Sequence, residues 1–186
     1  MPVSVEVTPR YVRRARQISQ ERMGSFEDND EWYSDAGEQG WGHEAHKRHF
    51  IGALGEMAFA IYYDLQVDTE TFSRTDGGSD FRVRFAERDA SDETVEVDVK
   101  CSPAENPDLI VETDSVDADY YVQCRLPHGP PENDERTTVE MLGGATKEML
   151  LNREPRRSLK YGHYNYHVGP EYLLELPPPG AVQPIE

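Results

Sequence analysis

The feature that most constrains the fold is a segment, residues 50–63, in which every position but one is apolar or small. Ile51, Leu54 and Ile61 recur at helical spacing, and the other apolar residues cover the remaining sides of the same helix. A helix that is apolar nearly all round must be buried over most of its surface. The segment therefore predicts a central helix over residues 43–65.

The one charged residue in this segment is Glu56. Burying a lone carboxylate costs several kcal/mol unless a cation or hydrogen-bond donors compensate, so Glu56 requires a partner. Its helical neighbours Gly52, Ala53 and Ala60 are small, which leaves space beside the carboxylate and lets another element approach closely. The segment alone leaves two partners open: a metal ion, and an arginine or lysine in a buried salt bridge.

A strand with strict period-two alternation is predicted at residues 94–100, Thr-Val-Glu-Val-Asp-Val-Lys. Its valines share one face, which indicates a well-buried strand, and the other face carries Glu96, Asp98 and Lys100. Asp98 and Lys100 lie about 6 to 7 Å apart along the strand. That spacing suits a carboxylate on a metal and a lysine beside an attacking water. The alternative is a solvated face with an ion pair worth at most about 1 kcal/mol.

A glycine-containing turn, Asp-Gly-Gly-Ser at residues 76–79, brings Asp80 to the start of a strand predicted over residues 81–85. This strand can pair with residues 94–97 as a hairpin, which would place Asp80 and Asp98 near the same end of adjacent strands. Carboxylate oxygens from separate elements suit Mg²⁺ or Mn²⁺. The alternative for Asp80 is a turn cap.

The rest of the chain supplies further short strands and two more helices. We predict strands over residues 3–7, 109–112, 120–126, 138–142 and 164–168, helices over 11–23 and 146–152, a long surface loop over 25–42 that is the best candidate for a mobile segment, and an irregular proline-rich end over 177–184. Helices followed by clustered strands predict an α/β or α+β fold with a central mixed β-sheet flanked by helices.

A chain of 186 residues fits a single domain. Residues 1–45 would hold the N-terminal strand, a basic helix and an acidic loop, residues 46–152 the core, and residues 153–186 a basic and aromatic segment with the proline-rich end. No stretch approaches the roughly eighteen apolar residues of a membrane span, and the first residues lack the apolar region of a signal peptide. We therefore expect a soluble, cytoplasmic protein. Cys101 and Cys124 are expected to be core thiols.

The charge balance is strongly acidic, with 36 acidic against 19 basic residues and a net charge of −17. Such a charge repels phosphate and by itself points away from DNA. However, few of the basic residues are lysines, and the acids are spread over the whole chain, as in proteins of salt-loving organisms. At molar salt the Debye length is about 3 Å, so only local contacts count. We interpret the acidity as a sign of a halophilic microbe or its virus.

A helix glutamate, a hairpin aspartate and an Asp-Val-Lys strand follow one another as Glu56, Asp80 and residues 98–100. This order resembles the PD-(D/E)XK nuclease superfamily over roughly residues 50–151. One departure is Ser79, which stands before the hairpin aspartate where the motif has proline. The resemblance implies a restriction-endonuclease-like core and a nuclease that hydrolyses phosphodiester bonds, with DNA as the expected substrate. It leaves homodimer formation open.

The resemblance also assigns roles to the site residues. Asp80, Asp98 and the backbone carbonyl of Val99 would hold Mg²⁺ or Mn²⁺, and Glu56 would bind the metal directly or through water. Lys100 would position and activate the attacking water. Two other functions remain open: a noncatalytic nucleic-acid binder that has kept the fold, and an acidic DNA mimic that inhibits a DNA-binding protein without any metal.

A basic segment interleaved with aromatic residues is the candidate nucleic-acid surface. It comprises Arg153, Arg156, Arg157, Lys160 and Tyr161. Arginine and lysine suit contacts with the phosphate backbone, and tyrosine suits base stacking. The alternative is that these arginines pair with surrounding acidic residues.

Overall fold

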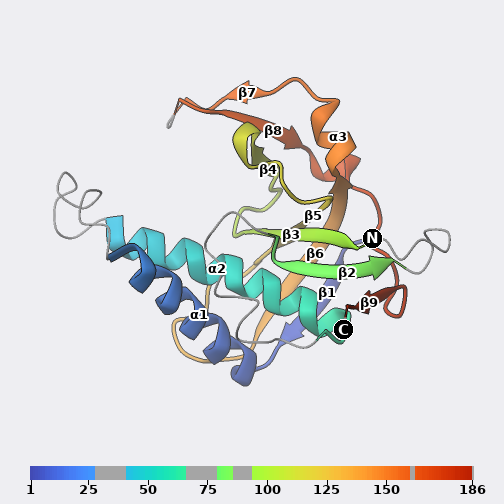
Figure 1. Cartoon of the computed structure of the whole chain (residues 1–186). Helices are drawn as coiled ribbons and strands as arrows, with labels where there is room; N and C mark the ends of the chain where they lie inside the picture. The colour runs from blue at the N-terminus through green and yellow to red at the C-terminus, as the bar shows by residue number, and fades with distance from the viewer. Residues whose placement is uncertain (28–40, 66–78, 86–93, 160–161, 186) are drawn as a thin grey trace.

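The computed structural model describes residues 1–27, 41–65, 79–85, 94–159 and 162–185 (Figure 1). The elements, in chain order, are β1 (Val3–Val7), α1 (Pro9–Glu27), α2 (Trp41–Tyr62), β2 (Phe81–Phe85), β3 (Val95–Ser102), β4 (Leu109–Glu112), η1 (Thr113–Ser115), β5 (Tyr120–Arg125), β6 (Thr137–Thr146), α3 (Lys147–Leu151), β7 (Arg156–Arg157), β8 (Tyr164–Val168), η2 (Pro170–Tyr172) and β9 (Val182–Pro184). The fold is therefore mixed α and β, as the order of patterns predicted.

The central sheet has the strand order β1-β6-β5-β3-β2-β9. β3 and β5 run parallel, and the other neighbouring strands are antiparallel, so the sheet is mixed. β2 and β3 pair with Phe81 opposite Val97 and Val83 opposite Val95. The predicted pairing of these two strands is thereby confirmed, and it sets the positions of the residues that flank it.

The helices α1 and α2 cover one face of this sheet (Figure 1). α2 packs against β3, β1 and β6, while α1 lies along α2. Leu54 and Met57 of α2 are fully buried in the same cluster as Val97 and Val99 of β3. The apolar helix and the alternating valines thus pack against each other, as their patterns require.

The other face of the central sheet is covered by a small three-stranded sheet, in the order β4-β8-β7, and by α3. Leu109 of β4, Leu150 of α3 and Val168 of β8 form a second apolar cluster with Tyr121 of β5. Residues 120–124 of β5 are buried without interruption, because this strand lies between the two clusters. The sheet is therefore flanked by helices on one face and by a short helix and a second sheet on the other.

Three features differ from the predicted elements. The chain end predicted as irregular contains β9, which pairs with β2 through Val182 opposite Phe85. The predicted loop over 25–42 is helical at its two ends, since α1 continues to Glu27 and α2 begins at Trp41. Residues 28–40, and the predicted mobility, lie outside the described residues. β7 was not predicted, because a two-residue strand of arginines has no period-two pattern to detect.

Neither cysteine forms a disulfide bond. Cys124 is buried and Cys101 is partly buried, and the two oppose each other on β5 and β3. Burial raises the pKa of the Cys101 thiol to about 12, which keeps it protonated. No helix among the described ranges is both long and apolar enough to cross a membrane.

Candidate functional site

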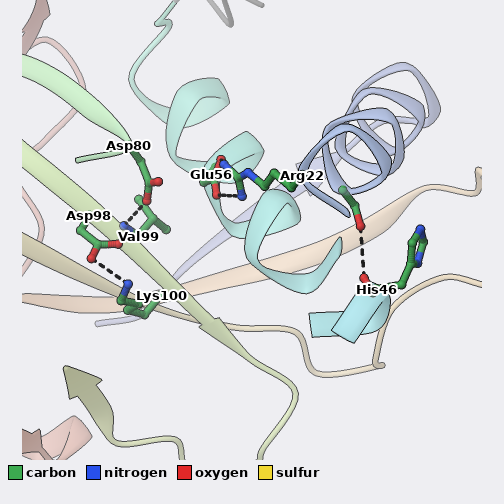
Figure 2. Close-up of polar contacts among 8 residues, drawn as sticks. Arg22, His46, Glu56, Asp80, Asp98, Val99 and Lys100 are labelled. Carbon is green, nitrogen blue, oxygen red and sulfur yellow. Dashed lines mark hydrogen bonds and ion pairs between the residues drawn. The ribbon is translucent and has the colours of Figure 1, made fainter. Parts of the chain in front are cut away.

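Glu56 lies at the contact between α2 and α1, and its side chain is only 3% exposed. Arg22 of α1 donates to it from Nη1 at 2.8 Å and from Nη2 at 2.9 Å (Figure 2). This bidentate geometry is a strong form of the carboxylate–guanidinium pair. Burial lowers the pKa of Arg22, but the charge of Glu56 outweighs burial and raises the pKa overall. The buried salt bridge that the sequence left open is therefore present.

Asp80 directly precedes β2 and lies beside β3. Pairing of the two strands begins at Phe81, opposite Val97, so Val99 extends beyond the paired region. The Val99 N–H donates a hydrogen bond of 2.7 Å to Asp80 Oδ2 (Figure 2). The Asp80 carboxylate thus satisfies the Val99 N–H, which no backbone group of β2 reaches. This hydrogen bond also holds Asp80 beside Asp98. Residues 76–78 of the preceding turn lie outside the described residues.

Asp98 and Lys100 lie on the face of β3 that looks away from α2. Lys100 Nζ is 2.7 Å from Asp98 Oδ2, and the side chains are 43% and 18% exposed, respectively. Burial lowers the pKa of Lys100, but the charges of Asp98, Asp80 and Glu56 outweigh burial and raise it. Lys100 is therefore an ammonium ion at neutral pH, a hydrogen-bond donor and not a base.

The four predicted site residues line one hollow of about 410 Å³. Glu56 reaches it from α2, Asp80 from the start of β2, and Asp98 and Lys100 from β3. Burial raises the pKa of Asp80 well above its ordinary value, and the negative charges of Glu56 and Asp98 raise it further. The hollow therefore concentrates three carboxylates in a poorly solvated place.

The donor atoms of Asp80 and Asp98 fit a hard divalent cation. Mg²⁺ in proteins is commonly held by one or two carboxylates together with waters and substrate phosphates. The raised pKa of Asp80 indicates that the surroundings disfavour its negative charge, and a bound cation would offset that effect. Within the described ranges, no group of three or more His, Cys, Asp or Glu side chains is arranged to hold one ion. Because Glu56 is paired with Arg22, the two aspartates are the better ligand pair.

Arg22 and His49 also line the hollow, and the sequence did not assign either of them to the site. Arg22 continues a buried stripe of α1 that contains Ala15 and Ile18, so a cation at this position was a detectable signal for a buried anion. His49 lies two helical turns before Glu56 on the same side of α2. Burial lowers its pKa, and Arg22 lowers it further, so the His49 imidazole is neutral at neutral pH.

The structure describes three of the five residues of the predicted nucleic-acid surface. Arg156 and Arg157 are exposed on β7, where Arg157 Nε donates to the Gly162 carbonyl at 3.2 Å. Arg153 lies over the ring of Tyr172 at 4.9 Å, a cation–π contact. Within the described chain these three arginines form no ion pair with an acidic residue. Lys160 and Tyr161 lie outside the described residues.

No protein-family model, curated protein or solved structure matches this chain. The mixed α and β architecture stands on the strand pairing described above. The interpretation of the site rests on its own residues and their geometry.

Two glycines of α2 provide a test of how the site is held. A Cβ on Gly55 would lie 2.8 Å from Cys101 Cβ, whereas a Cβ on Gly52 would meet nothing within 4 Å. We expect Gly55→Ala to destabilise the fold by about 1–3 kcal/mol, because α2 must move away from β3. Gly52→Ala should stabilise it by about 0.5–1 kcal/mol, because alanine favours the helix. Urea denaturation measures both, and equal effects would contradict the close packing.

Proposed function

We propose that this protein is a divalent-metal-dependent nuclease with a restriction-endonuclease-like core. The observation that carries the proposal is the convergence of Glu56, Asp80, Asp98 and Lys100 on one hollow at the edge of β3. These residues come from separate elements and resemble the PD-(D/E)XK order. Crowded carboxylates beside a lysine that is charged at neutral pH suit the binding of a cation and a phosphate.

Each residue has a separate role in the proposed reaction. Asp80 and Asp98 would hold the metal, with the Val99 carbonyl as the expected backbone ligand. A bound Mg²⁺ or Mn²⁺ would stabilise charge that develops on the phosphate and would lower the pKa of a bound water. Lys100 donates hydrogen bonds that orient the attacking water or a phosphate oxygen, since its ammonium keeps its protons at neutral pH.

Glu56 and Arg22 form the back of the site. Arg22 neutralises a carboxylate that burial alone would make costly, and it lines the hollow with its own positive charge. Glu56 in turn holds Arg22 in place through both guanidinium contacts. In this proposal Glu56 acts on the metal through water, while its direct bonds go to Arg22.

DNA is the proposed substrate, despite the net charge of −17. The field of the whole chain repels DNA at low salt, but screening over about 3 Å at molar salt leaves the contacts of Arg48, Lys100 and the exposed β7 arginines. We therefore expect DNA binding and cleavage to tolerate, or to require, high salt. An ordinary DNA-binding protein loses affinity steeply as salt rises.

Replacing Lys100 by methionine tests the function. The variant keeps the packing of the side-chain stem and loses the ammonium, so we expect metal-dependent cleavage to fall by about 10²–10³-fold. Cleavage is measured on plasmid and single-stranded DNA with Mn²⁺ at molar salt, and with EDTA as the blank. Lys147→Met, at the start of α3 and outside the hollow, is the matched control and should cut like wild type.

The outcomes separate the rival functions. Equal cleavage by wild type and Lys100→Met would refute the assigned site. A wild-type protein that binds DNA and cuts nothing under any of these conditions would be a noncatalytic binder. A protein that binds no DNA but forms a tight complex with a DNA-binding protein would be the acidic mimic that its charge favours.

A further inference from the structure

A second hollow, of about 810 Å³, adjoins the first. Arg48, Lys100 and Ile110 line both hollows, so the two meet at these side chains. Its remaining wall comes from β4, η1 and the strand β8 with the residues before it. We call it the β4–β8 hollow. A polymer whose phosphate lies at Lys100 would carry a neighbouring nucleotide into this space.

The side chain of Asn165 on β8 is an unusual part of its wall. Asn165 is only 7% exposed, and its Oδ1 is buried without any hydrogen-bond partner among the described residues. Buried amide oxygens are nearly always paired, and leaving one unpaired costs stability. Asn165 is one of the side chains that line the hollow. An unpaired acceptor oxygen suits a ligand that supplies a hydrogen-bond donor.

The neighbouring surfaces suit a flat ring. Ile110 is 46% exposed, which is high for a large apolar side chain, and it stands at the junction of the two hollows. The His163 imidazole lines the same space, with Nε2 3.3 Å from Glu112 Oε1. Apolar and imidazole faces are the kind on which unstacked bases lie.

We propose that the β4–β8 hollow binds an unstacked base of a single-stranded nucleic acid whose backbone lies over Arg48 and Lys100. This inference rests on the proposed function and names its substrate class. An asparagine amide offers one acceptor and one donor side by side. The Watson–Crick edge of every base also has a donor beside an acceptor, so the amide can pair with any of them.

The burial of Asn165 is the reason for proposing a single-stranded ligand. Asn165 lies within the wall, so a base can reach it only after leaving a duplex stack, and unpairing carries an energetic cost that a single strand has already avoided. Arg48 and Lys100 would contact the sugar–phosphate backbone, whereas the Asn165 amide would contact the base. The first hollow would thus bind the backbone and the β4–β8 hollow the base.

The test measures binding of fluorescent oligodeoxyadenylate, oligodeoxycytidylate and oligothymidylate in EDTA, so that no bond is cut. We expect Asn165→Leu to bind each of the three about tenfold more weakly than wild type, the loss typical of one amide–base contact. It should also melt at a higher temperature than wild type, because the unpaired acceptor is gone. The exposed Asn152→Leu is the matched control and should bind like wild type.

A wild-type protein that binds none of the three oligomers would overturn the inference, as would an Asn165→Leu variant that binds them as tightly as wild type. Neither result bears on cleavage, which Lys100→Met tests separately. Conversely, single-strand binding that depends on Asn165 in a protein that never cuts DNA would uphold this hollow and refute the nuclease.

Discussion

Arg22→Met is expected to destabilise the fold by about 3–5 kcal/mol, the usual result of removing one partner of a buried ion pair. The reason is the state of Glu56, which is 3% exposed and would be left as a buried anion beside Asp80 and Asp98. Urea denaturation in EDTA measures the change. Arg136→Met is the matched control. Arg136 also donates to a glutamate, Glu6, at 2.9 Å, but both side chains are mostly exposed, so at most about 1 kcal/mol should be lost.

A second substitution separates charge from packing. Replacing Glu56 by leucine in the Arg22→Met background removes the stranded anion, and most of the lost stability should return. If the double variant is as unstable as Arg22→Met alone, the loss comes from the methionine and not from the unpaired carboxylate.

The single variant Arg22→Met also tests whether Glu56 belongs to a cation site. Without Arg22, Glu56 adds its charge to those of the two aspartates, and a divalent cation should offset all three. We expect Mn²⁺ to raise the melting temperature of Arg22→Met more than that of wild type, by mass action on the folded state. An Arg22→Met protein that does not respond to Mn²⁺ would leave Glu56 as a structural partner of Arg22 alone.

The sequence predicted the centre of this molecule well, because its two patterns are strong and independent. Only a buried helix is apolar on every side, and only a buried strand alternates as residues 94–100 do. Their packing against each other, and the pairing of β2 with β3, follow from these patterns and from a short connection. Asp80 and Asp98 therefore lie together, as the hairpin requires.

The rest depended on contacts between distant parts of the chain. Glu56 and Arg22 are 34 residues apart. Neither segment alone indicates whether the partner of Glu56 is a metal or an arginine. β9 was hidden by Pro184 and by the prolines before the strand, and an edge strand tolerates a proline because it leaves one row of donors unpaired. The β4–β8 hollow exists only because β8 returns beside β4, and these two segments are even more remote in sequence than Glu56 and Arg22.

Asp80→Asn is expected to raise stability in the absence of metal and to reduce cleavage by about a thousandfold or more. The loss of activity follows from the removal of a metal ligand, since a metal contributes several kcal/mol to transition-state stabilisation and each 1.4 kcal/mol is tenfold in rate. The gain in stability has a different origin. The asparagine oxygen can still accept the Val99 N–H, but the charge that repels Glu56 and Asp98 is gone.

The pH dependence gives this prediction a second readout. The folded-state pKa of Asp80 is raised above its ordinary value of 3.8, so the folded protein holds this proton more tightly than the unfolded chain does. Ionised Asp80 therefore destabilises the fold, and its cost appears as the pH rises from its unfolded pKa through the folded one. The stability difference between Asp80→Asn and wild type should grow over that interval and then level off. Urea denaturation in EDTA at a series of pH values measures it.

Asp119→Asn is the matched control. Asp119 Oδ2 also accepts a backbone N–H of β3, from Glu96 at 2.9 Å, but its side chain is exposed and outside the 410 Å³ hollow. The control should cut DNA like wild type and show no comparable gain in stability. Retained cleavage in Asp80→Asn would remove Asp80 from the metal site. A stability profile that matches that of Asp119→Asn at every pH would show that the carboxylates of the hollow do not repel one another, and the argument for a cation between them would fail.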